Sequence, residues 1–167
     1  MLLETERLKL RPLTLDDVDP LVEVLGDAHS MRFYPHPFER AEVVRWIERQ
    51  IDLYRTEGFG LWGLELKDGG RMIGDCGLTP QTPIEAEEIE VGWHVHPRFQ
   101  RMGYASEAAT ACRDWGFDNL DVEQLISMIR PENVPSQGVA RKIGMTRGEH
   151  FYYKDTLHEL WSVARPG

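Results

Sequence analysis

The segment Glu87–Asn119 constrains the fold of this chain more than any other stretch. Its first part, Glu88–Val95, has aromatic and β-branched residues at roughly alternating positions, which predicts a β-strand. Pro97 cannot donate a ladder hydrogen bond, so it ends that strand or marks an edge. From Ala105 onward, apolar residues return at helical spacing. The residues between them, Gln100–Ala105, are therefore expected to form a strand-to-helix turn.

A turn of this kind is suited to binding an anion. The first amides of a helix lack intrahelical acceptors and lie at the positive end of the helix dipole. Gly103 permits a positive φ and the close approach of a ligand, while the small Ala105 and Ser106 leave the helix start uncovered. Arg98 and Arg101 add positive charge nearby. The sequence predicts a loop for phosphate or pyrophosphate; for the loop motif alone, the alternative is an ordinary turn.

The composition narrows the functional classes. A length of 167 residues suits one domain, 1–167, with its own core. The formal net charge of −9 disfavours nucleic acid as a partner and is compatible with a cationic acceptor such as an amine. No apolar run approaches the ~20 residues that span a bilayer. The segment Met1–Glu6 also lacks the basic start and apolar core of a signal peptide, so no membrane association and a cytoplasmic location are expected.

Metal chemistry is not expected from the sulfur and imidazole groups. Cys76 and Cys112 are too few and too far apart for a disulfide framework or a thiolate metal site. His94 and His96 alternate along a predicted strand and do not have the spacing of a His-x₃-His pair. We therefore predict no bound metal.

Periodicity and turn residues also predict the remaining elements. The expected strands are 7–11, 59–66, 71–78, 124–129, 146–152 and 158–164, and the expected helices are 14–25, 39–57 and 133–142. Residues 27–38 and 79–86 are expected to be irregular connections. In the first of these, Phe33, Tyr34 and His36 either line an acceptor pocket or pin the loop to the core.

These motifs, in this order, resemble those of the GNAT superfamily of N-acetyltransferases. The strand, Gln100-x-x-Gly103-x-Ala105 and the helix resemble its acyl-CoA-binding motif. The segment Glu90–Val95 followed by Pro97 is similar to the branch that includes the acetyltransferases of ribosomal-protein N-termini. Two further segments fit the family pattern: Thr5–Arg11, and Asn133-x-x-Ser136 followed by Lys142-x-Gly144. The resemblance implies an α/β (α+β) GNAT fold, with a mixed, mostly antiparallel central sheet flanked by helices.

The resemblance also implies acetyl-CoA as cosubstrate and a set of residues that bind it. The loop amides from Arg101 to Ser106 would hold the pyrophosphate, and the pantetheine arm would lie beside the end of the central strand. A free amide at Val95 would serve as oxyanion donor. Asn133 would bond the pantetheine arm, act as a helix cap, or do both. The implied cofactor-binding set is Trp93, His94, Val95, Gln100, Arg101, Met102, Gly103, Tyr104, Ala105, Ser106 and Asn133.

The same resemblance implies two catalytic residues. Glu90, on the central strand, is the candidate base for an amine that is mostly protonated at neutral pH; Glu88 is its alternative on the same face. Many family members carry a tyrosine in the short helix that protonates the departing thiolate, but the equivalent position here is Ala140. Ser136 is the candidate substitute as general acid, and its alternative role is to start the helix.

The expected reaction is acetyl transfer from acetyl-CoA to a primary amine by direct attack in a ternary complex. A cysteine relay is not expected, because neither cysteine lies near the predicted site in sequence. Two alternatives stay open: a catalytically inactive CoA-binding module, and an acyltransferase that uses a longer donor such as succinyl-CoA. The acceptor is either a protein N-terminus or a small molecule. The final hairpin supplies aromatic residues for a homodimer interface or for the core: Phe151, Tyr152, Tyr153 and Trp161.

Overall fold

The computed structural model describes residues 3–167, so Met1 and Leu2 of the segment compared with a signal peptide lie outside the described part. Its eight strands form a single sheet with the order β1-β2-β3-β4-β5-β6-β8-β7. The strands are β1 (Leu3–Glu4), β2 (Leu8–Pro12), β3 (Leu61–Leu66), β4 (Met72–Gln81), β5 (Glu88–Val95), β6 (Gln124–Ile129), β7 (Thr146–Tyr153) and β8 (Thr156–Ala164).

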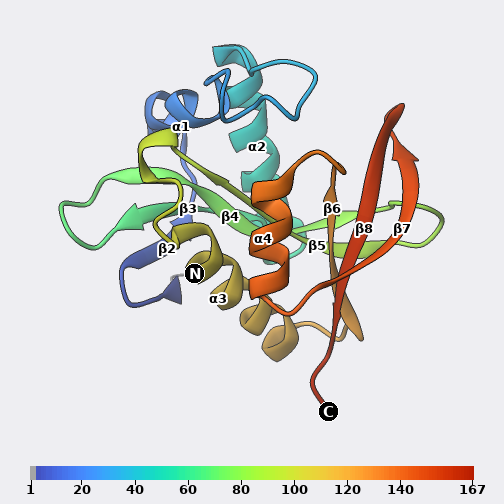
Figure 1. The fold of residues 1–167 in the computed structure, drawn as a ribbon. Coiled ribbons are helices and arrows are strands. Elements are labelled where there is room, and N and C mark those ends of the chain that lie inside the picture. The colour runs from blue at the N-terminus through green and yellow to red at the C-terminus, as the bar shows by residue number, and fades with distance from the viewer. Residues whose placement is uncertain (1–2) are drawn as a thin grey trace.

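Neighbouring strands pair antiparallel throughout this sheet except at one position. β5 and β6 run parallel, and they are joined by a crossover through helix α3 (Tyr104–Asn119). The β3–β4–β5 meander leads directly into that crossover, as Figure 1 shows. The mixed, mostly antiparallel sheet expected from the sequence is therefore confirmed.

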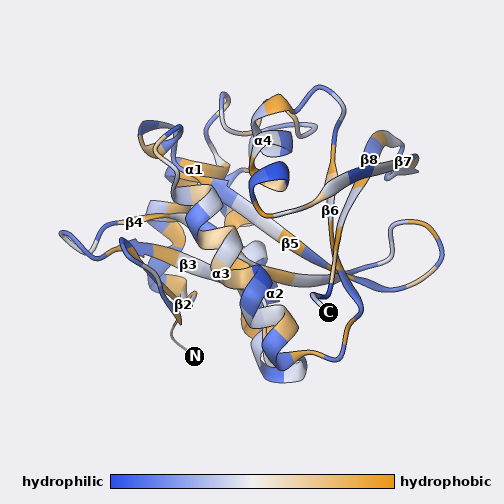
Figure 2. Ribbon diagram, turned by 60° about the horizontal axis from the view of Figure 1, so that its bottom comes forward, coloured by the Kyte–Doolittle hydropathy of each residue, from blue (hydrophilic) through white to orange (hydrophobic). Residues whose placement is uncertain are grey.

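Helices cover both faces of the sheet. α1 (Val18–Leu25) and α2 (Arg40–Thr56) pack against each other on one face, while α3 and α4 (Val134–Lys142) pack together on the other (Figure 1). Hydrophobic and hydrophilic residues alternate around these helices, as expected when one side faces a sheet (Figure 2). Short 3-10 turns, Leu15–Asp17 and Pro97–Phe99, precede α1 and α3.

Two hydrophobic clusters follow from this arrangement. The larger lies under α3 and α4 and includes the fully buried Leu64, Leu78 and Leu125. The smaller lies under α1 and α2 and includes Leu21 and Ile47. Each cluster fixes one helix pair to its own face of the sheet, so the strand between them, β5, carries side chains toward both pairs.

Most predicted elements agree with the structure, but the short strand β1 was not predicted, β3 begins later and β8 earlier than expected, and the end of β4 was wrong. Residues 79–81 were expected to be irregular because of Pro80, yet β4 continues to Gln81 and pairs with β5. The pairing of β3 with β4 extends only to Gly77, so beyond it β4 has a free edge. A proline that lacks an N–H is tolerated at such an edge.

The aromatic residues of the last hairpin divide between core and surface. Phe151 and Trp161 are buried, whereas the side chain of Tyr152 is exposed. The buried pair therefore belongs to the core, and the expectation of a homodimer interface stays a prediction. Within residues 3–167, we find no helix with the length and apolar character needed to cross a membrane.

Candidate active site

The central feature of the site is a gap between β5 and β6. In the described chain these strands form a register pair only at Glu90 and Ile126. Beyond that point side chains bridge the two edges. Ser127 Oγ donates to the Val91 carbonyl at 2.7 Å, and the Met128 amide donates to the Glu90 carboxylate at 2.8 Å. The strands diverge toward the end of β5, which leaves backbone groups accessible there.

The amide of Val95 points into this gap. The His96 amide donates to the Ile73 carbonyl at 2.7 Å. In an antiparallel ladder the amides of one strand alternate in direction, so the Val95 amide is directed away from β4 and toward the β6 side. The Val95 carbonyl accepts a hydrogen bond from Gln100 Nε2 at 2.9 Å, which ties the end of β5 to the following loop.

The loop after β5 has the geometry of an anion-binding turn. Gly103 caps α3 with φ 84°, and Arg101 also has a positive φ, 62°. The first helical hydrogen bond runs from the Glu107 amide to the Gly103 carbonyl. The amides of Tyr104, Ala105 and Ser106 thus precede the first intrahelical bond, and they lie at the positive end of a 16-residue helix.

An ion pair with the N-terminal segment fixes this loop. Arg7 Nε lies 2.7 Å from a Glu107 carboxylate oxygen, and Arg7 Nη1 donates to the Met102 carbonyl at 2.9 Å. Thr5 Oγ1 donates to the same carboxylate. Burial opposes ionisation of Glu107, but the hydrogen bonds from Thr5 and Arg7 hold the pKa of its carboxyl below the ordinary value. Arg7 and Glu107 therefore join the segment before β2 to the first turn of α3.

These elements border a cleft of about 600 Å³. Its walls come from the loop before α2, the end of β5, the loop and first turn of α3, and α4. Among the described residues that line it are Arg32, Arg101 and Lys142, whereas no aspartate or glutamate does. The chain has 28 acidic and 19 basic residues in total, so the cleft has the opposite charge balance to the chain as a whole. Such a cleft favours an anionic ligand.

Most of the predicted binding residues converge on this cleft. Trp93, His94, Val95, Gln100, Arg101, Gly103, Tyr104, Ala105, Ser106, Asn133 and Ser136 line it. Met102 is not among the lining residues, and its side chain is 53% exposed. Glu90 and Arg98 are also outside the lining set.

Glu90 lies on the face of β5 that carries α1 and α2. It lies four positions before His94, so the two side chains share a face of the strand. Burial raises the pKa of the Glu90 carboxyl to about 7, against the opposing effects of the Met128 amide and the nearby His94. A carboxyl with that pKa changes between acid and base near neutral pH.

The opposite face of β5 contacts α4. Trp93 Nε1 donates to Ser136 Oγ at 3.3 Å, and the Asn133 side chain accepts from the Ser136 amide at 3.2 Å. Asn133 is thus the N-cap of α4, as the sequence allowed. Ala140 is fully buried in the larger hydrophobic cluster. The hydroxyl that faces the cleft from this helix is that of Ser136, one turn earlier.

The sequence interpretation missed a buried polar group beside the cleft. Asp75, on β4, is fully buried and is the cross-strand partner of His94. Its carboxylate oxygens lie 2.7 Å from His94 Nδ1 and 2.9 Å from Trp46 Nε1. His94 Nε2 lies 2.7 Å from the Tyr34 hydroxyl. The one available signal was an aspartate in the middle of a predicted apolar strand.

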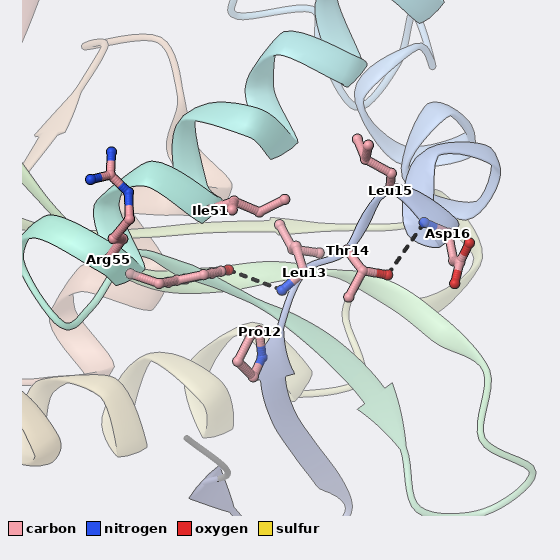
Figure 3. A pocket seen from close by; sticks show the side chains of 8 residues that line it. Pro12, Leu13, Thr14, Leu15, Asp16, Ile51 and Arg55 are labelled. Atoms are coloured by element: carbon pink, nitrogen blue, oxygen red, sulfur yellow. Dashed lines mark hydrogen bonds between the residues drawn. The ribbon is translucent and has the colours of Figure 1, made fainter.

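A second hollow lies between the end of β2 and α2 (Figure 3). It is lined by Pro12–Asp16, Ile51, Tyr54 and Arg55. The Tyr54 hydroxyl accepts from the Leu13 amide at 3.0 Å and donates to the Leu61 carbonyl, so it is already committed to the backbone. This hollow lies apart from the loop of α3 and contains no comparable group of convergent donors, so we assign the site to the cleft.

Comparisons with known proteins identify the family and the fold. Residues 7–146 match the model of the family described as "Acetyltransferase (GNAT) domain". A relative from Bacillus subtilis, named "Uncharacterized N-acetyltransferase YnaD", is 29% identical over 175 aligned positions, covering 97% of this chain and all of the relative. An acetyltransferase from Agrobacterium tumefaciens has the same fold, with a TM-score of 0.84 and 27% identity over 98% of this chain and 94% of that one.

The branch suggested by the sequence is also represented among solved structures. The ribosomal-protein-S5-alanine acetyltransferase of Vibrio fischeri superposes with a TM-score of 0.73, covering 99% of this chain and 97% of that one, at 17% identity. At that identity the likeness concerns the fold alone. From the family match over residues 7–146, the chain belongs to the GNAT acetyltransferase family and is an acyltransferase.

Proposed function

We propose that this acyltransferase moves the acetyl group of acetyl-CoA to a primary amine by direct attack in a ternary complex. The observation that supports this best is the cleft itself. In a chain of net charge −9, it is lined by basic residues and by the free first-turn amides of α3, with no acidic residue among the described lining. The phosphates of a CoA thioester match that environment.

In this proposal the donor lies along the α3–α4 side of the cleft. The amides of residues 101–106 hold the pyrophosphate, and Arg101 adds charge. Trp93 and Val95 flank the pantetheine arm, and His94 borders it from the α1–α2 side of the cleft. Gln100 fixes the loop, and Asn133 bonds the arm while it caps α4. The amide of Val95 then donates to the thioester carbonyl oxygen, where negative charge develops during attack.

Glu90 is the proposed base for the arriving amine. A primary amine with a pKa of ~10 is mostly protonated at neutral pH and must lose a proton before it attacks. The carboxyl of Glu90, with its pKa raised to about 7 by burial, changes between its acid and base forms near neutral pH and accepts a proton directly or through water. Glu88 shares a hydrogen bond with Gln124 at 3.0 Å and is the weaker candidate.

Ser136 is the proposed hydroxyl for the departing sulfur. Its oxygen already accepts a hydrogen bond from Trp93, which leaves its own O–H free to donate toward the cleft. A serine hydroxyl stabilises a thiolate by hydrogen bonding. The thiolate is a tolerable leaving group, because the reference pKa of a thiol is ~8.5.

The first test is thermal unfolding with and without acetyl-CoA, followed by an acceptor screen. Binding at 100 times Kd adds roughly 2.7 kcal/mol, which raises Tm by about 5–10 °C for a domain of this size. The screen measures thiol release with spermidine, tryptamine, and peptides that begin with alanine or serine. A thermal shift without thiol release for any amine would favour the inactive CoA-binding module. A larger shift and faster turnover with succinyl-CoA would favour the longer donor.

Location and assembly are separate proposals. We propose that the protein acts in the cytoplasm, where acetyl-CoA and amine acceptors are both present, and fractionation of cells that express it tests this. A homodimer through the final hairpin is tested by the molar mass in solution, compared between the wild type and Tyr152→Ser. Neither result alters the proposed reaction.

A further inference from the structure

A chain of hydrogen bonds runs from the core of the protein to the cleft. It begins at Trp46 on α2, passes through Asp75 on β4 and His94 on β5, and ends at Tyr34 in the loop before α2. The separations are 2.9, 2.7 and 2.7 Å, all within hydrogen-bonding range. We refer to Asp75, His94 and Tyr34 as the relay.

The chemistry of the three groups fixes the direction of each bond. An ionised carboxylate only accepts, so the Asp75 oxygen beside His94 Nδ1 requires a proton on Nδ1. A neutral imidazole then has an unprotonated Nε2, which accepts. The Tyr34 hydroxyl is therefore the donor to His94 Nε2, and its oxygen lone pairs remain available to a group in the cleft.

The relay has a buried end and an open end. Asp75 is fully buried, the His94 side chain is 12% exposed, and Tyr34 is 39% exposed and lines the cleft together with His94. Trp46 and His94 also pack at 5.7 Å between ring centroids, in an edge-on arrangement, which restricts the imidazole. Tyr34 is therefore the member of the relay that is most open to the cleft.

The relay also lies beside the proposed base. His94 projects from the same face of β5 as Glu90, and the ordinary pKa of a tyrosine hydroxyl is ~10. Tyr34 consequently stays neutral and keeps its proton at neutral pH. The helix α4, in contrast, offers a buried alanine at position 140, which has no group that can donate a proton.

We propose that Tyr34 is a catalytic residue that carries one proton from the attacking amine to the departing sulfur, with His94 and Asp75 as positioning residues that store this proton in between. This proposal rests on the proposed acetyl transfer. Glu90 prepares the neutral amine beforehand, and the relay acts on the proton that must leave nitrogen afterwards.

The proton and bond changes balance. As the new C–N bond forms, a nitrogen proton passes to the Tyr34 oxygen while the original hydroxyl proton passes to His94 Nε2, giving an imidazolium beside the Asp75 carboxylate. As the C–S bond breaks, Nε2 returns its proton to Tyr34, which passes one to the sulfur. The products are an amide and a thiol, the relay ends as it began, and no other reactant is needed.

The kinetic test is Tyr34→Phe, assayed with whichever amine of the screen has the highest kcat/KM. The variant keeps the ring but cannot carry a proton. General acid–base groups contribute about 10²–10⁴-fold, so kcat is expected to fall about 100-fold with KM for acetyl-CoA within about twofold. Tyr152→Phe, which removes a hydroxyl from the exposed face of β7, is the matched control and should leave kcat unchanged. A Tyr34→Phe enzyme with wild-type kcat would overturn the proposal.

Two further variants separate proton transfer from simple support. If the three residues act as one unit, Tyr34→Phe combined with His94→Gln should be no slower than the slower single variant, because such effects are non-additive. Asp75→Asn should lower kcat while retaining the acetyl-CoA thermal shift. If the kcat losses of the two single variants multiply in the double variant, or if the substitutions change only KM, the network only shapes the cleft.

An NMR measurement tests the relay without any acceptor. In protein labelled with ¹⁵N-histidine, the His94 resonances, assigned by their absence in His94→Gln, should show a protonated Nδ1 and an unprotonated Nε2. The Nε2 resonance should move in Tyr34→Phe. The opposite tautomer would overturn the proposal even in an active enzyme. The predicted tautomer in a protein that acetylates no amine would instead show that the proposed function, and not the proton arrangement, had failed.

Discussion

The two faces of β5 differ in how their residues reach the cleft. On the α3–α4 face, Trp93 and the loop of residues 100–106 follow one another in sequence, and the nearby helix start adds Asn133 and Ser136. On the α1–α2 face, Tyr34, Asp75 and His94 come from three separate segments. A binding surface for phosphate can be built from consecutive backbone amides. A proton relay needs side chains of different chemistry, and these come from different elements.

This difference separates two kinds of kinetic effect. Substitutions on the α3–α4 face should change the affinity for acetyl-CoA, and substitutions on the α1–α2 face should change kcat. A substitution on the α3–α4 face that changed only kcat, or one on the α1–α2 face that changed only the affinity for acetyl-CoA, would contradict this division between the faces.

The largest expected effect is that of Glu90→Gln. Removing the proposed base should lower kcat by about 10²–10⁴-fold while the acetyl-CoA thermal shift stays the same. In the wild type, kcat should rise with pH up to about 7 and then level off, since the pKa of the Glu90 carboxyl is about 7. Glu88→Gln is the control, and a Glu90→Gln enzyme that retained the wild-type pH profile would remove Glu90 from the mechanism.

The same group should affect stability in a defined direction. Its folded-state pKa of about 7 lies above the ordinary value of 4.5, so the folded state binds more protons between these two values. The stability contributed by the protonated carboxyl is therefore lost as pH rises from about 4.5 to about 7. Urea unfolding of the wild type and of Glu90→Gln at pH 5 and pH 8 checks this. The variant should gain stability relative to the wild type at the higher pH.

A smaller effect is expected for Gly103→Val at the start of α3. Gly103 has φ 84°, and a Cβ at this position would lie 3.3 Å from Arg7 Nη2. A β-branched residue in this conformation costs on the order of 1–3 kcal/mol, so the loop should rearrange and Kd for acetyl-CoA should rise about tenfold. Calorimetric titration measures this. Gly58→Val, also at a positive φ of 80° but at the end of α2, should leave Kd unchanged.

Arg7→Ala tests the ion pair behind the loop. Its guanidinium bonds Glu107 and the Met102 carbonyl, so its loss should leave the loop less ordered and raise KM for acetyl-CoA by about three- to tenfold at unchanged kcat. Arg55→Ala removes an exposed pair with Asp52 and serves as the control. An equal change in KM for both variants would mean that only net charge matters.

Ser136→Ala has the smallest expected effect. If Ser136 only bonds the departing sulfur and Tyr34 supplies the proton, kcat should fall by about two- to fivefold, the value of one neutral hydrogen bond. A loss of kcat comparable to that of Tyr34→Phe would identify Ser136 as the general acid. The α3–α4 face would then supply the proton as well as bind acetyl-CoA.

The sequence alone determined the part of this protein that is proposed to bind acetyl-CoA. The central strand, the turn at Gln100–Gly103, the helix that follows and the cap at Asn133 were all predictable, because each depends on residues within a few positions of one another. Local periodicity, positive-φ glycine and capping are properties of short segments. The burial of Phe151 and Trp161, by contrast, depends on how the hairpin packs against the core, which no local pattern specifies.

Only the tertiary structure decided which side chains form the relay on the α1–α2 face. Asp75 and His94 become partners through the register of β4 against β5, and Tyr34 joins them because the loop before α2 folds back over the end of β5. No local pattern encodes that meeting. Strand register and loop position are fixed by the packing of both hydrophobic clusters, which is a property of the whole chain. The sequence by itself therefore does not predict which residues meet to form the relay.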